Sequence, residues 1–368
     1  MELCGFKEKI SVRTMRIGVY IEPWISQRAG ISVFTEHLTR STENSPNTYI
    51  TIGSKQMDVP NEHILIPKWK ASQLNLLRYL GLAKIDLTDH RLDYIIDPGH
   101  FACLDLFKGP SRVVIVHDLT PLLFPKYHKI KSVIAHRLLM NRSLKMCEKI
   151  ITVSENTKED VIKHYGHSSK LSRIYPGVRD LSQVEEDAFE EKSDAPFILS
   201  VGTIEPRKNH KKLIEAFEAF CIHNHTDFLY IVGDEGWKVS INELIASSSN
   251  GARIKYLGYV SKPRLKQLYS RALFSIYISL YEGFGFPLLE SMKMGCPVIS
   301  SNVGSMKEIS DEAAILVNPN AKDEIAQSML RLSSDEDLRR TLIVAGIEQG
   351  RKFQWTNYIK ELDAILVE

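Results

Sequence analysis

The sequence predicts an α/β protein of two Rossmann-like domains, each with a doubly wound parallel sheet, that face each other across a cleft. A chain of 368 residues is longer than one core usually serves, which indicates two domains. Short apolar runs alternate with longer helical patterns, and this alternation restarts after an acidic segment in the middle of the chain. Such crossover connections favour parallel strands that helices cover on both faces.

The first predicted strand is RIGVYI at 16–21, and it follows a leader without an apolar pattern. We expect the first 14 residues to form little structure, and Met15 is an alternative start of translation. A loop with Ala29 and Gly30 and a helix over about 31–40 come next. Further strands of this half are predicted at 48–53, 94–97, 112–116 and 149–153.

The acidic stretch at 179–196 contains few large apolar residues, and we interpret it as the linker between the domains. The strand pattern then resumes with the same alternation of strands and helical segments. Strands are predicted at 197–202, 228–233, 253–260, 273–279, 297–301 and 314–319.

Composition limits the classes of protein to which this chain can belong. Hydrophobic residues make up 43% and charged residues 25%, which are values of globular proteins. The sequence has no apolar run long enough to span a bilayer, the N-terminus lacks the pattern of a secretory signal, and the five cysteines include no C-x-x-C pair. We therefore expect a cytoplasmic protein with reduced thiols.

The charge of the chain is unevenly distributed. Residues 1–180 hold 26 Lys and Arg against 18 Asp and Glu, whereas the remainder holds 21 against 27. A basic N-terminal half indicates an anionic partner on that side, and a membrane surface is favoured over nucleic acid.

The most informative segment is YEGFGFPLLE at 281–290. It carries two carboxylates, Glu282 and Glu290, with two glycines, Pro287 and an apolar run between them. Because proline is tolerated at the first helical position, we expect a loop with Glu282, a helix that starts near Pro287, and Glu290 about one turn into it. The start of this helix would favour an anion. Two surface acids near a helix start are the alternative interpretation.

Two pairs of polar residues follow predicted strands. Arg207 and Lys208, in VGTIEPRKN at 201–209, are candidates to bind phosphate, although adjacent cations on a loop are usually solvated. His117 and Asp118 follow the strand RVVIV, where successive side chains point to opposite faces and so do not readily bind one ion together. A buried structural histidine is the alternative for His117.

Five segments, taken together and in order, resemble the motifs of one known family. They are YEGFGFPLLE, VGTIEPRKN, VHDLTP at 116–121, VSENTKEDV at 153–161 and YPGV at 175–178. From about Met15 to its end, the chain resembles the retaining glycosyltransferases of family 4, which have the GT-B fold. The resemblance implies an acceptor-binding domain at 1–180, a domain for the nucleotide sugar at 181–354, and a helix at 355–368 that packs back on the first domain.

The resemblance also implies roles for individual residues. Glu282 would touch the donor sugar near the reacting carbon, and Glu290 would accept hydrogen bonds from the ribose of the nucleotide. Arg207 and Lys208 would bind the diphosphate in place of a metal ion, and His117 would lie against the donor sugar. The implied catalytic residues are thus His117, Glu282, Arg207 and Lys208. Further donor-binding candidates are Gly30, Asp118, Thr203, Gly283, Phe284, Gly285 and Phe286.

Two positions depart from the family pattern. Thr203 stands where many relatives carry an arginine, and Arg207 is a candidate to supply the missing charge. Ala29 stands beside Gly30 where relatives often have a second glycine, which leaves the shape of that loop open.

We predict that no metal ion or other cofactor is required. The only Asp-x-Asp spacing, Asp335 to Asp337, follows two serines and is typical of a helix start with acids in its first turn. His223 and His225 have no cysteine partners nearby in the sequence, and we interpret them as surface residues.

A basic stretch with interleaved apolar residues at 126–149 is the first candidate for contact with an acceptor. It is either a solvated helix packed on its own domain or a helix that lies on anionic lipid. A second candidate is the stretch at 67–84. We therefore hypothesise peripheral contact with the inner face of the cell membrane and a lipid-linked or other glycan acceptor.

The resemblance implies a retaining, metal-independent glycosyltransferase that moves a hexose from a nucleotide sugar to a glycan or lipid-linked acceptor in surface-polysaccharide or O-antigen synthesis. GDP-mannose is the leading donor, with dTDP-rhamnose and UDP-sugars as alternatives. A sugar-nucleotide epimerase and a non-catalytic binding protein of the same architecture also remain open. A nicotinamide-dependent oxidoreductase is disfavoured because neither first strand leads into G-x-G-x-x-G.

Overall fold

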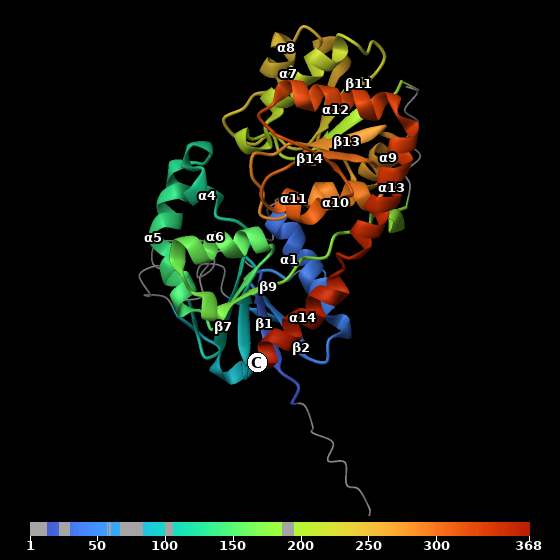
Figure 1. The fold of residues 1–368 in the computed structure, drawn as a ribbon. Helices are drawn as coiled ribbons and strands as arrows, with labels where there is room; N and C mark the ends of the chain where they lie inside the picture. Colours follow the sequence, from blue (N-terminus) through green and yellow to red (C-terminus); the bar gives the residue numbers. More distant parts are fainter. Residues whose placement is uncertain are drawn as a thin grey trace, which may run out of the picture.

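The computed structural model describes residues 13–21, 30–56, 58, 60–66, 84–99, 106–185 and 195–368. It contains two α/β domains, one above the other in Figure 1, each with a parallel sheet between layers of helices. The prediction of two domains with parallel sheets is thereby confirmed. The stretch at 67–84, the second candidate for contact with an acceptor, lies outside the described residues, apart from Lys84.

The N-terminal sheet has seven parallel strands in the order β3-β2-β1-β5-β7-β8-β9. These strands are β1 (Arg16–Tyr20), β2 (Thr48–Gly53), β3 (Glu62–Leu65), β5 (Tyr94–Asp97), β7 (Ser111–Val116), β8 (Lys149–Thr152) and β9 (Leu171–Arg173). The short strands β4 (Ile85–Asp86) and β6 (Phe107–Lys108) pair with each other beside this sheet. The sequence pattern did not predict β3, β9 or this pair.

The C-terminal sheet has six parallel strands in the order β12-β11-β10-β13-β14-β15. They are β10 (Phe197–Val201), β11 (Phe228–Val232), β12 (Ile254–Gly258), β13 (Phe274–Tyr277), β14 (Val298–Ser301) and β15 (Ile315–Val317). All six fall within the strands that the sequence predicts for this half. The chain order reverses between β10 and β13, as it does between β1 and β5 in the first sheet.

Helices connect the strands and cover both sheets (Figure 1). The helices of the first domain are α1 (Gly30–Arg40), α4 (Thr120–Leu123), α5 (Ile130–Met146) and α6 (Glu155–Tyr165), with 3-10 turns η1 (Ser41–Asn44) and η4 (Pro125–Tyr127). Those of the second are α7 (His210–Cys221), α8 (Ile241–Ser247), α9 (Lys262–Arg271), α10 (Phe286–Lys293), α11 (Gly304–Ser310), α12 (Lys322–Ser334) and α13 (Glu336–Arg351). The last helix of the chain is α14 (Trp355–Val367).

Caps fix several of these helices in the expected way. Asp335 is the N-cap of α13 and accepts a hydrogen bond from the backbone N–H of Leu338 at 2.8 Å, as expected for the acids at this helix start. Ser154 caps α6 in the same manner through the N–H of Thr157 at 3.0 Å. In the described parts of the chain, none of the helices is long and apolar enough to cross a bilayer.

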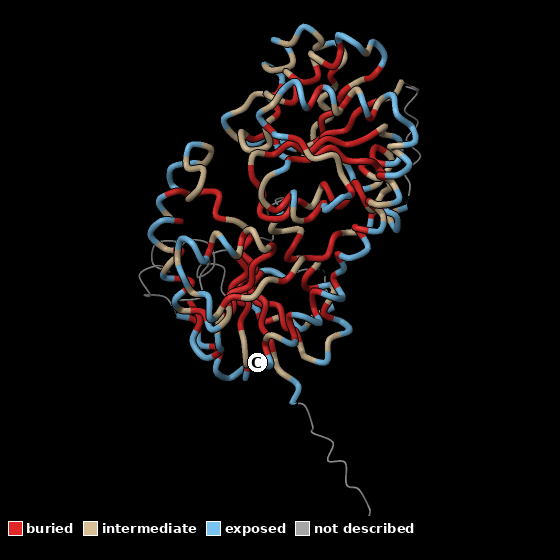
Figure 2. The backbone as a smooth tube through the Cα atoms, in the orientation of Figure 1, coloured by how far each residue is buried: buried red, intermediate tan, exposed pale blue. Residues whose placement is uncertain are grey.

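Neighbouring side chains along a central strand point to opposite faces of the sheet. Each face packs against its own layer of helices, so both faces are buried. In β1, Ile17 and Val19 belong to a core shared with α1 and α14, whereas Tyr20 belongs to a core shared with α5 and α6. In β10, Ile198 packs with α7 and α12, and Leu199 packs with α9. Figure 2 shows the buried strands running through the middle of each domain.

A buried carboxylate fixes the last helix to the N-terminal domain, where α14 lies beside α1 (Figure 1). Asp363 is 8% exposed and accepts hydrogen bonds from three side chains. The donors are Ser45 Oγ at 2.6 Å, Asn47 Nδ2 at 3.0 Å and Tyr49 OH at 2.7 Å. The preceding helix α13 belongs to the second domain, so the chain crosses back to the first domain between α13 and α14.

We expect Asp363→Ala to lower the free energy of unfolding of the N-terminal domain by about 3 kcal/mol. Hydrogen bonds to a charged group contribute roughly 1.5–3 kcal/mol each when the donor is left buried. Of the three donors only Tyr49 is buried, whereas Ser45 and Asn47 are partly exposed and can bond to water after the carboxylate is lost. A urea titration followed by circular dichroism measures the change. The control is Glu361→Ala, which removes an exposed acid from the same helix. Equal midpoints for the two variants would show that Asp363 does not hold α14.

Candidate active site

The candidate site lies where the order of the C-terminal sheet reverses. At such a switch point, the chain leaves two adjacent parallel strands in opposite directions and opens a crevice at their carboxyl ends. Here the strands are β10, followed by residues 202–208, and β13, followed by residues 278–285. The sequence-predicted cations and the first predicted acid lie on these two segments.

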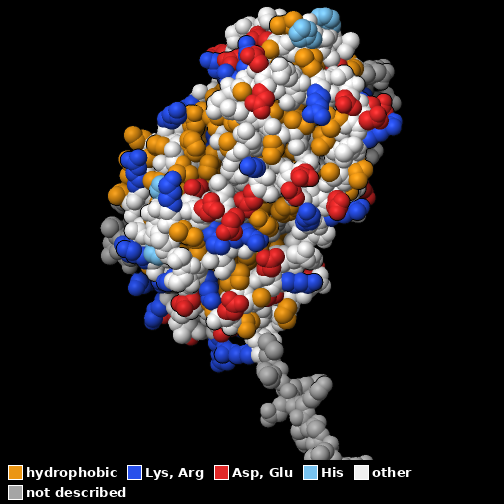
Figure 3. All heavy atoms as spheres, in the orientation of Figure 1, with side chains coloured by type: hydrophobic (Ala, Val, Ile, Leu, Met, Phe, Trp, Pro, Cys, Tyr) orange, Lys and Arg blue, Asp and Glu red, His pale blue; other side chains and the backbone are white. Residues whose placement is uncertain are grey.

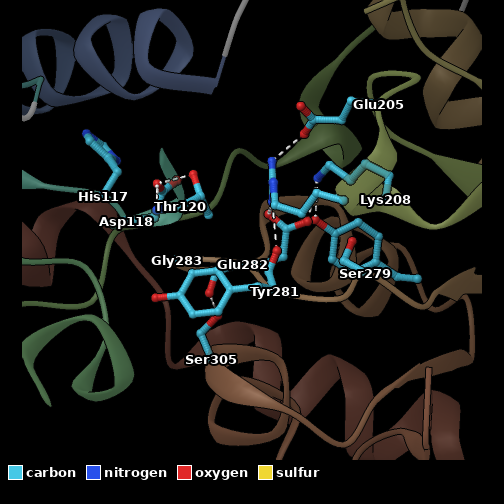
Figure 4. A network of polar contacts seen from close by, with 12 residues as sticks. His117, Asp118, Thr120, Glu205, Lys208, Ser279, Tyr281, Glu282, Gly283 and Ser305 are labelled. Carbon is cyan, nitrogen blue, oxygen red and sulfur yellow. Dashed lines mark hydrogen bonds and ion pairs between the residues drawn. The ribbon is translucent and has the colours of Figure 1, made fainter. Parts of the chain in front are cut away.

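Glu282 forms ion pairs with both cations. Its Oε1 accepts from Lys208 Nζ at 2.7 Å, and its Oε2 accepts from Arg207 Nη1. The carboxylate is 7% exposed, so the network is shielded from water. Figure 4 shows the side chains of Glu282, Lys208 and Glu205 directed toward one another. The structure therefore brings together Arg207, Lys208 and Glu282, which the sequence predicted as functional.

Glu205 is a fourth member of this network that the sequence reasoning missed. It is 3% exposed and accepts a hydrogen bond from Arg207 Nη2. Arg207 thus lies between two carboxylates, and Lys208 also donates to Tyr277 OH at 2.7 Å. Its position in the sequence was the available signal. Glu205 precedes Arg207 by two residues, and both follow the same predicted strand, so both could reach the same site.

Burial and pairing act in opposite directions on these groups. Burial raises the pKa of the Glu282 carboxyl, but the cations of Arg207 and Lys208 outweigh it and lower the pKa to about 2. Burial lowers the pKa of Arg207, yet the carboxylates of Glu282 and Glu205 raise it overall. Glu282 is therefore ionised at neutral pH, where it can accept hydrogen bonds but cannot act as an acid.

Hydrogen bonds to backbone carbonyls hold the two segments together. The Tyr281 carbonyl accepts from Arg207 Nη1 at 2.8 Å, and the N–H of Leu280 donates to the Arg207 carbonyl at 2.9 Å. On the other side, Ser305 Oγ donates to the Glu282 carbonyl at 2.7 Å. These contacts fix the backbone on both sides of the Glu282 side chain.

Glu290 lies in a separate ion pair. As expected, it falls about one turn into a helix that begins near Pro287, because α10 starts at Phe286. It is 5% exposed and pairs with Arg179, at 2.7 Å to Nε and 3.0 Å to Nη2. Arg179 was missed because the segment at 179–196 is interpreted from the sequence as the linker between the domains. Its position directly after the YPGV motif was the signal that could have revealed it.

The N-terminal domain contributes His117 and Asp118 from the carboxyl end of β7. His117 is 8% exposed, its Nε2 lies 2.7 Å from the Pro98 carbonyl, and burial lowers the pKa of its ring. Asp118 Oδ1 accepts from the N–H and the hydroxyl of Thr120 at 2.9 and 2.6 Å. Asp118 is also close enough to raise the pKa of Arg207. In Figure 4 this pair lies beside Gly283 and apart from Lys208 and Glu205.

Gly283 lies at a close contact between the two domains. A Cβ placed on Gly283 would lie 1.7 Å from the His117 carbonyl oxygen, so no other residue fits without movement. Its own carbonyl accepts from Thr157 Oγ1 of α6 at 3.3 Å. The glycine is thus required by contact between the domains, which is a reason that the sequence reasoning did not consider.

The other predicted donor-binding residues differ in how far they are buried. Phe284 is buried and packs its ring against Phe353, at 5.7 Å between centroids, while Phe286 is partly buried beside it. Gly285 precedes α10 with a φ of 121°, a backbone conformation that favours glycine. Thr203 and Gly30, in contrast, are exposed.

In the parts of the chain that the structure describes, no group of three or more His, Cys, Asp or Glu side chains is arranged to hold an ion. His223 and His225 are both exposed, as expected for surface residues.

We expect Gly283→Ala to weaken the contact between the domains, because the methyl group overlaps the His117 carbonyl. Differential scanning fluorimetry should show a lower melting temperature, and small-angle X-ray scattering a larger radius of gyration. The control is Gly30→Ala at an exposed helix start, where an added Cβ meets no atom within 4 Å. A compact and equally stable Gly283→Ala protein would contradict this account of the interface.

Comparisons with known proteins agree with this arrangement. The family model described as Glycosyltransferase Family 4 matches residues 28–180, and the model described as Glycosyl transferases group 1 matches residues 182–349. O-antigen chain mannosyltransferase B of Escherichia coli is 29% identical over 276 residues, which are 68% of this chain and 71% of that protein. O-antigen chain mannosyltransferase RfbU of Salmonella typhimurium is 29% identical over 211 residues, and the alignment spans only 57% of each protein.

Solved structures agree in fold. The Anabaena HepE protein in complex with UDP and glucose superposes with a TM-score of 0.72 over 96% of this chain and 99% of that one, at 17% sequence identity. The two family models together follow the two domains of the structure, and the superposition includes both. The chain therefore belongs to the family 4 glycosyltransferases and has their GT-B fold.

Proposed function

We propose that this glycosyltransferase moves a hexose, with mannose from GDP-mannose as the leading candidate, to a glycan or lipid-linked acceptor in O-antigen or related polysaccharide synthesis. The observation that carries the proposal is the buried network of Glu282, Arg207 and Lys208 at the switch point of the C-terminal sheet. The choice of mannose is supported by the similarity to two O-antigen mannosyltransferases. dTDP-rhamnose and UDP-sugars are the alternative donors.

The two cations would stabilise the departing nucleotide. As the bond between the sugar carbon and the phosphate oxygen breaks, negative charge collects on the diphosphate. One unit charge at 4 Å with an effective dielectric constant near 20 contributes roughly 4 kcal/mol before desolvation. Arg207 and Lys208 are held in place by carboxylates before the reaction starts, so little reorganisation is needed.

We further propose that transfer proceeds with retention and without a metal ion. Glu282, with a pKa of about 2, is ionised and cannot protonate the leaving group. It would touch the donor sugar near the reacting carbon, as the family resemblance implies. The acceptor oxygen would then bond to the sugar carbon on the face that the phosphate leaves, and its proton would pass to the departing phosphate oxygen.

A surface on α5 supports a lipid-linked acceptor. Ile130, Ile134 and Leu138 are 74%, 51% and 71% exposed and recur every four residues, so they form one stripe along the helix. The basic residues around this stripe are Lys126, Lys129, Lys131, Arg137, Arg142 and Lys145. Figure 3 shows hydrophobic and basic side chains mixed on this flank of the molecule. An apolar stripe flanked by cations fits an anionic membrane surface.

We expect Glu282→Ala to lower the transfer rate by at least about 100-fold, because a positioned charge at the reacting centre is lost. The assay measures transfer of mannose from GDP-mannose to lipid-linked acceptors and compares GDP-mannose with dTDP-rhamnose and UDP-sugars. The control is Glu312→Ala, which removes an exposed acid of the same domain. A normal rate for Glu282→Ala would remove the main residue assignment.

The same assay tests the remaining parts of the proposal. Transfer should continue in EDTA, and the product should keep the anomeric configuration of the donor. Strict dependence on a divalent ion would contradict the role given to Arg207 and Lys208. An altered sugar nucleotide without any transferred sugar would favour the epimerase instead.

We expect the protein to float with vesicles that contain phosphatidylglycerol at low salt, and to be released by high salt because the attraction is partly electrostatic. The double variant Ile134→Asn/Leu138→Asn should stay in the soluble fraction. Val344→Asn is the matched control, because Val344 is an apolar side chain 68% exposed on α13. Equal flotation of both variants, or none for the wild type, would favour a soluble acceptor.

A further inference from the structure

Tyr281 joins the two domains next to the candidate active site. Its hydroxyl donates a hydrogen bond to Asp160 Oδ2 of α6 and accepts one from Asn156 Nδ2 at 3.2 Å. Asn156 and Asp160 are four residues apart, so they lie on the same face of α6. The tyrosine ring is buried and lies 5.4 Å from the ring of Phe124.

The backbone of the same residue holds the active-site arginine. The Tyr281 carbonyl accepts from Arg207 Nη1, and this same nitrogen donates to Glu282 Oε2. A shift of Tyr281 therefore moves its own carbonyl, which accepts from Arg207, and also moves the next residue, Glu282. Figure 4 shows Tyr281 immediately beside Glu282 and Gly283.

Helix α6 forms hydrogen bonds to residues 281–283 at two points. Asp160 holds the side chain of Tyr281, and Thr157 donates to the carbonyl of Gly283 at 3.3 Å. Glu282 lies between the two points. The position of α6 is in turn tied to the second domain, since the N–H groups of Glu155 and Asn156 donate to Glu308 of α11 at 2.7 and 3.0 Å.

The contact is built from the N-terminal domain and acts on residues of the C-terminal domain. When the domains separate, Asp160 and Tyr281 must part, and the backbone that carries Glu282 loses its support from α6. The cations keep their own bonds to Glu282, but the orientation of the whole segment is no longer fixed from both sides.

We propose that Asp160 is a positioning residue that holds Tyr281 and thereby aligns Arg207 and Glu282 when the two domains are in contact. The proposal rests on the glycosyl transfer proposed above and adds that transfer depends on contact between the two domains. Asp160 would not touch the substrate. Its effect on the reaction passes through the Tyr281 hydroxyl and carbonyl.

Four variants test the proposal: Tyr281→Phe, Asp160→Ala, Asp160→Asn and the double variant Asp160→Ala/Tyr281→Phe. The first two should each lower kcat roughly 10- to 100-fold, because displacement of reacting groups by about 1 Å has effects of that size. KM for the donor should change less than about threefold, since the proposed phosphate contacts are intact in the ground state. The double variant should be no slower than the slower single variant, because the two residues act as one unit.

Two comparisons separate positioning from a merely structural role. Asp160→Asn keeps an acceptor oxygen for the tyrosine and should recover part of the lost kcat. Glu159→Ala, on the neighbouring exposed position of α6, should leave kcat and KM unchanged. Additive losses in the double variant, or single variants with a normal kcat, would overturn the proposal.

Hydrogen–deuterium exchange gives a readout that does not depend on activity. In Asp160→Ala and Tyr281→Phe, peptides that cover 279–286 should exchange faster, while peptides from β10 and β11 keep the wild-type rate. Unchanged exchange in 279–286 would overturn the proposal. If the wild type transfers no sugar, the proposed function fails, whereas this measurement still decides whether Asp160 holds the segment.

Discussion

The arrangement of the C-terminal domain depends on one buried carboxylate that lies between two cations. Glu282 pairs with Arg207 and Lys208, although its own chain segment follows β13 and theirs follows β10. Removing one partner from a buried ion pair leaves an uncompensated charge, which typically costs about 3–5 kcal/mol. The two segments must therefore stay together, and they do so at the point of the sheet where a ligand crevice is expected.

The same segment also determines how the two domains meet. Gly283 lies against the His117 carbonyl, and Tyr281 bonds to Asp160, so the residues on either side of Glu282 contact the N-terminal domain. A movement of the domains relative to each other would consequently displace the backbone that carries Glu282 and its ion pairs. The geometry of the charged network and the contact between the domains thus depend on the same short stretch of chain.

The network carries two carboxylates and two cations, so its charges are balanced before any ligand binds. This balance offsets the cost of withdrawing Arg207 and Lys208, whose side chains are 13% and 12% exposed, from water. An incoming diphosphate would share the cations with Glu282 and Glu205 and would find them already oriented. Ion pairs hold the side chains of Arg207 and Lys208 in fixed orientations, which favours a preorganised site.

The alternation of apolar strands with helical patterns was sufficient to predict two parallel-sheet domains, because parallel strands need helical crossovers that leave a regular trace in the sequence. Local spacing likewise predicted that Glu290 lies one turn into a helix that starts near Pro287. The partners of these residues could not be predicted in this way. Arg179 reaches Glu290 across 111 positions, and Asp160 reaches Tyr281 across 121. Asp160 and Tyr281 meet because α6 of one domain packs against a loop of the other, and Arg179 meets Glu290 because the connection after β9 passes α10. Only the folded chain contains that information.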